Sequence, residues 1–113
     1  SNAAAICGDI ADRDTAQAAV ALAQERFGGV DIVVNNAAII RDAFIFKANH
    51  DAWDAVIRAN LTGAYRLLAA ATPVMRDGAK ADRAPGAIVN IVSSAGIYGN
   101  FGQSAYASAK AGL

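Results

Sequence analysis

The sequence is poor in the features that mark secreted or nucleic-acid-binding proteins. Cys7 is its only cysteine, so no internal disulfide can form, which predicts a reducing, cytoplasmic setting. Lysine plus arginine and aspartate plus glutamate each total 10, which gives a formal net charge of zero. The chain therefore lacks the excess of basic residues expected of a nucleic-acid-binding protein, and no nucleic-acid partner is expected.

Long apolar runs and metal-binding patterns are also missing. The longest apolar stretches, such as residues 67–75, are too short to span a bilayer, and no signal peptide is recognised, so no membrane partner is expected. His50 is the single histidine, and no Cys/His/Asp spacing predicts a metal site. The opening residues 1–3 resemble the remnant of a cleaved expression tag, which leaves residues 4–113 as the domain to explain.

Apolar runs and helical stretches alternate along the rest of the chain. Strands are predicted at residues 4–10, 30–36 and 86–94, and helices at 12–29, 51–60, 61–75 and 104–113. The β-branched run at 30–36 is typical of a parallel strand buried on both faces. The alternation predicts an α/β protein with a parallel sheet, helices on both faces and right-handed crossovers.

Capping residues mark the ends of two of these helices. Asp14 is the expected N-cap of the first helix, which Gly28 or Gly29 ends. Asn49 or Asp51 is the expected N-cap of the helix that follows. The polar stretch at 76–86 is expected to be a solvated connection.

Tyr106 and Lys110 form the most suggestive pair in the last predicted helix. They are four residues apart, so they share one helix face. A free tyrosine hydroxyl has a pKa near ~10, and an adjacent ammonium lowers that pKa toward the range of a general acid or base. The alternative is a surface tyrosine beside a solvated lysine, and the pair alone does not decide between the two.

Polar residues at predicted strand ends and inside a helix add further candidates. Ser93 ends the third strand, where ligands gather in open parallel sheets, although turn or cap serines are also common there. Asn60 lies mid-helix, where it either breaks the helix or holds a functional kink or water. Residues 35–38, Asn-Asn-Ala-Ala, end the second strand with small side chains that let a flat ring approach, or form an ordinary turn.

Four motifs together resemble the short-chain dehydrogenase/reductase family. They are NNAA, NLTGAY, IVNIVSS and YASAK, in this order, and the resemblance covers nearly the whole chain. The resemblance implies a Rossmann-like doubly wound fold and hydride transfer between a nicotinamide cofactor and an alcohol/ketone pair. It implies that Tyr106 exchanges the proton and Lys110 lowers its pKa. It further implies that Ser93 orients the substrate oxygen and that Asn60 holds a relay water.

The same resemblance implies a set of cofactor contacts and a choice of cofactor. NAD or NADP is expected, with NAD favoured. The implied contacts are the adenine-facing pair Asp9 and Ile10, the strand end Asn36, Ala37 and Ala38, and the nicotinamide side Tyr106 and Lys110. For Asp9, a carboxylate would accept a hydrogen bond from the exocyclic amine, and the alternative is a loop cap.

A narrower resemblance concerns the substrate. IIRDAF and SSAGIYGNFGQSAYASAK resemble the 3-hydroxyacyl-CoA dehydrogenase part of peroxisomal multifunctional β-oxidation enzymes and their bacterial relatives. This implies a small-molecule 3-hydroxyacyl or 3-oxoacyl thioester, such as an acyl-CoA, as substrate. A steroid, sugar or polyol substrate remains the alternative. Family resemblance also implies a homodimer or homotetramer.

The family's opening strand and glycine-rich pyrophosphate turn have no counterpart in this sequence. We therefore expect residues 4–113 to form the central portion of the sheet only, without the first βαβ unit and the C-terminal part. In the family's strand order, residues 4–10 would lack their usual neighbours. A second hypothesis, of a different class, is a non-catalytic fragment of such an enzyme.

Overall fold

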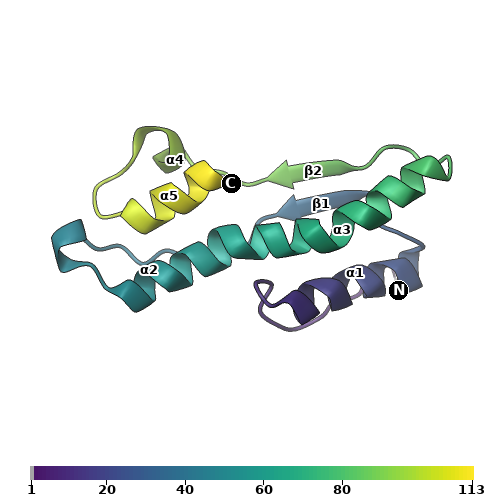
Figure 1. Ribbon diagram of the computed structural model, residues 1–113, viewed down its shortest axis with the longest axis horizontal. Helices are drawn as coiled ribbons and strands as arrows, with labels where there is room; N and C mark the ends of the chain where they lie inside the picture. The colour runs from purple at the N-terminus through teal and green to yellow at the C-terminus, as the bar shows by residue number, and fades with distance from the viewer. Residues whose placement is uncertain (1) are drawn as a thin grey trace.

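Two parallel strands organise the computed structural model, which describes residues 2–113. Strand β1 (Ile32–Asn35) pairs with β2 (Ala87–Asn90) in register from the first residue of each strand to the last. Both arrows point toward the end of the molecule that holds α4 and α5 (Figure 1). The parallel pairing confirms an α/β arrangement in this part of the chain.

Helices cover one side of this short sheet. The long helix α3 (Gly63–Lys80) runs beneath the strands and packs against α1 (Arg13–Phe27) (Figure 1). Val20 of α1, Val33 of β1 and Ala71 of α3 form the buried core between them. The expected burial of the second strand on both faces is wrong for the described chain, because Ile32 and Val34 alternate with the buried positions and are exposed.

Residues 4–10 do not form the predicted strand. They carry no regular secondary structure, and residues 2–9 are exposed. A strand needs a neighbour to satisfy its N–H and C=O groups, and no other strand lies beside this segment within the described residues. Instead the chain turns sharply, and the backbone N–H of Asp12 donates to the carbonyl of Asp9 at 2.9 Å.

The helix ends follow most of the local signals. Asp12, not Asp14, precedes α1, so that prediction is wrong by two residues. Gly28 ends α1 with a left-handed φ of 79°, which glycine adopts without steric cost. Asn49 caps α2 (His50–Ile57), where its Oδ1 accepts a hydrogen bond from the backbone N–H of Ala52 at 3.0 Å.

The predicted break near Asn60 is a wide π-helical turn. This turn, η2 (Arg58–Thr62), joins α2 to α3 without ending the helical run. Helix α3 continues through Pro73 to Lys80, so part of the expected connection at 76–86 is helical. Insertions of this kind recur at functional sites.

Short elements complete the architecture. They are the 3₁₀ turn η1 (Ile45–Lys47), the helix α4 (Ala95–Tyr98) and the helix α5 (Ser104–Gly112). The whole measures 52 × 26 × 23 Å, with α4 and α5 beyond the carboxyl ends of the strands (Figure 1). Within residues 2–113, every helix is too short or too polar to cross a membrane.

Candidate functional site

The two strands end in a matched pair of asparagines. The Nδ2 of Asn35 donates to the Oδ1 of Asn90 at 2.8 Å, across the last residue pair of the sheet. The bond fixes the register of β1 and β2 at the edge where parallel sheets bind ligands.

Lys110 is buried and tied to the end of β2. Only 4% of the residue is exposed. Its Nζ donates to the carbonyl of Ile91 at 2.6 Å and lies 5.7 Å from the centre of the Tyr106 ring. Burial lowers the pKa of the Lys110 ammonium. The alternative of a solvated lysine is therefore wrong, and the ammonium is held against the tyrosine.

Close packing of α4 on α5 brings Ser93 toward the same end. Helix α4 begins two residues after Ser93, whose Oγ accepts a hydrogen bond from the backbone N–H of Ala95 at 3.2 Å. This bond uses an oxygen lone pair and leaves the hydroxyl proton free to donate elsewhere. Gly96 permits the close approach, because a Cβ there would lie 2.8 Å from the backbone nitrogen of Ala111 on α5.

Asn60 is the most buried polar side chain of the site. It is 1% exposed, and its Nδ2 donates to the carbonyls of Val56 at 2.8 Å and Ile39 at 2.9 Å. These bonds connect the π turn to the loop after β1. Its Oδ1 has no hydrogen-bond partner among residues 2–113. A buried acceptor of this kind is suited to a water or ligand donor.

A cleft of about 230 Å³ collects several predicted contacts. Its lining includes Ile10, Asn36, Ala37 and Asn60. The remaining lining residues are Val34, Asn35, Ala59, Ala64 and Leu67. Ala38 is exposed and lies outside this lining, as do Ser93, Tyr106 and Lys110. The structure thus divides the predicted site into the cleft and the Tyr106–Lys110 pair.

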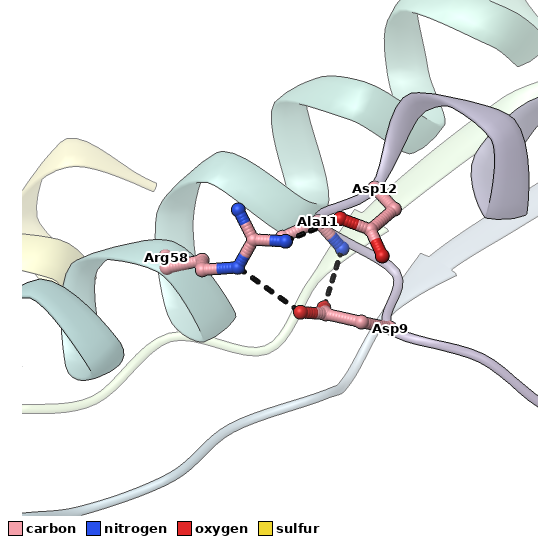
Figure 2. Close-up of polar contacts among 4 residues, drawn as sticks. All are labelled: Asp9, Ala11, Asp12 and Arg58. Carbon is pink, nitrogen blue, oxygen red and sulfur yellow. Dashed lines mark hydrogen bonds and ion pairs between the residues drawn. The ribbon is translucent and has the colours of Figure 1, made fainter.

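Asp9 directly precedes Ile10, which lines the cleft, and its carboxylate is held from two sides (Figure 2). Its Oδ1 accepts from the backbone N–H of Ala11 at 2.8 Å, and its Oδ2 accepts from the Nε of Arg58 at 3.0 Å. The Ala11 N–H is the largest cause of the lowered pKa of Asp9. Desolvation opposes it, and the hydrogen bond and charge of Arg58 lower the pKa further. Arg58 also pairs with Asp12.

Sequence reasoning missed Arg58 entirely. It stands 49 positions from Asp9, and no spacing rule connects the two. Arg58 is the first residue of the π turn η2, and its side chain reaches the loop that precedes α1. Only the tertiary structure shows the link.

The residues present fit the adenine end and the nicotinamide end of a dinucleotide. The cleft is lined mostly by apolar side chains, Asp9 directly precedes the lining residue Ile10, and Lys110 holds its ammonium just beyond the end of β2. Polar groups gathered at the carboxyl ends of parallel strands are typical of doubly wound α/β proteins. The fold and these groups together indicate a dinucleotide-binding protein of the doubly wound α/β class.

Comparison with known proteins identifies the family. The profile of the short chain dehydrogenase family matches residues 1–113, and the chain belongs to this family. A solved structure of a short chain dehydrogenase from Mycobacterium avium superposes with a TM-score of 0.86 at 41% identity, over 92% of this chain and 36% of the other.

Curated relatives are similar along nearly the same stretch. The hydroxyacyl-CoA dehydrogenase ChsB1 of Mycobacterium tuberculosis is 45% identical over 98% of this chain and 36% of its own length. The 3-oxoacyl-[acyl-carrier-protein] reductase FabG of Thermotoga maritima is 39% identical over 93% of this chain and 41% of its own. Acetoacetyl-CoA reductase of Cupriavidus necator is 43% identical over 94% of this chain and 41% of its own length. The chain thus spans about two fifths of these relatives.

Proposed function

We propose that the protein is an NAD(P)-dependent oxidoreductase that interconverts a secondary alcohol and a ketone. The observation that carries the proposal is the buried Lys110, fixed by Ile91 and held against Tyr106. A cation fixed beside the phenol at the carboxyl ends of the strands is suited to a proton exchange between Tyr106 and the substrate oxygen. NAD is favoured over NADP, as in the sequence analysis.

The chain's own residues divide the proton chemistry among them. When the alcohol is oxidised, its hydroxyl proton passes to the Oη of Tyr106, and the reverse transfer occurs when the ketone is reduced. The hydroxyl of Ser93 donates to the substrate oxygen and orients it. The free Oδ1 of Asn60 accepts from a water that connects the pair to solvent. The bound nicotinamide supplies or accepts the hydride.

We propose a 3-hydroxyacyl or 3-oxoacyl thioester as the substrate. Relatives named for hydroxyacyl-CoA, 3-oxoacyl-[acyl-carrier-protein] and acetoacetyl-CoA support this class. The segment from Ser93 to Lys110, which resembles hydroxyacyl-CoA dehydrogenases, supports it as well. A substrate panel of acetoacetyl-CoA beside a steroid, a sugar and a polyol separates the thioester from the alternatives.

The test of the proposed function is Tyr106→Phe in the full-length protein. Removing the hydroxyl should lower turnover of the best substrate by at least about 100-fold, the usual contribution of a positioned acid or base. Tyr65→Phe is the matched control, because Tyr65 is exposed on α3 and has alanine, not lysine, four residues later. Turnover retained in Tyr106→Phe would contradict the proposal.

A further inference from the structure

The turn from Asp9 to Asp12 is clamped by one side chain from the π turn. Arg58 donates through Nε to Asp9 and through a terminal nitrogen to Asp12, which spans the turn at both ends (Figure 2). All three side chains are about half exposed, with 49% of Arg58 and 48% of Asp9 accessible. A surface ion pair of this kind contributes little to stability. We therefore look for a role of Arg58 in how it orients the Asp9 carboxylate.

The clamp fixes the direction of the Asp9 carboxylate. One oxygen is bound by the Ala11 N–H and the other by Arg58, so rotation of the carboxylate would break a bond. Each oxygen keeps a second lone pair that can accept a hydrogen bond. Without Arg58, a single bond to Ala11 would hold the group, and Oδ2 would be free to move.

The clamp is also joined to the cleft. Ile10, between the two clamped aspartates, lines the cleft and lies over Gly63, where a Cβ would come within 2.7 Å of its Cγ2. Arg58 belongs to the same π turn as Asn60, which also lines the cleft. Arg58 therefore connects the Asp9 carboxylate and the neighbouring Ile10 to the π turn that carries the lining residue Asn60.

We propose that Arg58 is a positioning residue that makes the cleft selective for purines with an exocyclic 6-amino group over 6-oxo purines. The inference rests on the proposed function, because it takes the cleft to be the adenine site of a dinucleotide. A carboxylate held in one place accepts from an amino group and repels a carbonyl oxygen at the same position. A mobile carboxylate would turn toward the ring N–H of a 6-oxo purine, and the selectivity would fall.

The experiment compares two dinucleotides that differ only at that position. Calorimetry measures the affinities of the full-length protein for NADH and for reduced nicotinamide hypoxanthine dinucleotide. NADPH and its hypoxanthine counterpart are measured in parallel. In Arg58→Met, the preference for the adenine form should fall about fivefold, since charge-assisted hydrogen bonds are strong and directional. Arg58→Lys keeps the charge and should recover part of the preference.

Arg83→Met is the matched control. Arg83 also joins distant segments, because it donates to the carbonyl of Gly28 and pairs with Asp31, but it lies outside the cleft. This variant should leave the ratio of the two affinities unchanged. A purely structural role of Arg58 would weaken both dinucleotides equally, and that result would overturn the inference.

The pH dependence gives a second readout. Arg58 helps to lower the pKa of Asp9, so its removal raises that pKa toward the ordinary value. As the pH is lowered, Arg58→Met should therefore lose its remaining preference for adenine at a higher pH than the unchanged protein does. The same pH midpoint in both would count against the inference. Unchanged protein that binds neither pair would instead overturn the proposed function, and the inference with it.

Discussion

The helical end of the molecule buries polar groups, whereas the outer side of the sheet leaves apolar side chains exposed. At the helical end, the ammonium of Lys110 and the amide of Asn60 are almost fully enclosed. On the sheet, Ile32 is 64% exposed and every residue of β2 is exposed. Polar groups are thus buried where the proposed chemistry lies, and apolar groups are exposed where it does not.

The difference shows that the site is constructed by short-range helix packing. Helix α5 contacts both the π turn η2 and helix α4, and the polar groups are enclosed at this end of the molecule. Burying polar groups costs free energy unless hydrogen bonds compensate, and Lys110 and Asn60 both have such bonds. The arrangement of these groups is explained by positioning and not by stability.

The largest expected effect on stability comes from Asn60→Asp. A carboxylate there would face the carbonyls of Val56 and Ile39, which now accept from Nδ2 at 2.8 and 2.9 Å. We expect a loss of about 3 kcal/mol in the free energy of unfolding at neutral pH, because the new buried charge has no partner. Urea unfolding followed by circular dichroism measures it.

The control for that change is Asn100→Asp, on the exposed loop before α5. Its Oδ1 accepts from the backbone N–H of Phe101, and that bond survives the substitution. The free energy of unfolding should change by less than about 0.5 kcal/mol. Equal effects in the two variants would mean that Asn60 is not enclosed as described.

A smaller loss in the free energy of unfolding is expected from alanine substitutions in the sheet, and it should differ between the two faces. Val33 on β1 is 5% exposed, and Val89 on β2 is 42% exposed. Val33→Ala should cost about 2 kcal/mol because it leaves a cavity beside α1 and α3, whereas Val89→Ala should cost less than about 0.5 kcal/mol. Both values come from the same urea titrations. A large cost at Val89 would show that this face is covered in solution.

Features that depend on neighbours in sequence were predictable. The parallel strands, the Asn49 cap, the Gly28 end and the shared face of Tyr106 and Lys110 follow from spacing and backbone preference alone. Each involves residues within one element or one crossover. The helix that carries the proposed catalytic pair was therefore correctly bounded from sequence.

Features that depend on distant partners were not predictable. Residues 4–10 have strand-like composition, but a strand forms only beside another strand. The Arg58–Asp9 pair joins positions 49 apart, and although Asn60 predicted a break in this helix, no residue pattern predicted that Arg58 would reach Asp9. The N-cap of α1 fell at Asp12 and not at Asp14. In the segment around Asp9, tertiary context decided what local preference left open.

Lys110→Met in the full-length protein is expected to have the smallest effect on stability, although it should strongly reduce turnover. Burial lowers the pKa of Lys110, so the folded state disfavours its charged form below that pKa, and the cost disappears as pH rises toward the ordinary lysine value. Methionine fills similar space without charge. The melting temperature at neutral pH should therefore stay the same or rise, and any gain should shrink at alkaline pH.

Turnover and melting temperature of Lys110→Met, measured on one preparation, test the central claim most directly. Lys80→Met, at the exposed end of α3, is the control and should change neither quantity. Turnover should fall at least about 100-fold in Lys110→Met, with no loss of melting temperature. Full turnover, or a loss of turnover that merely follows unfolding, would contradict it.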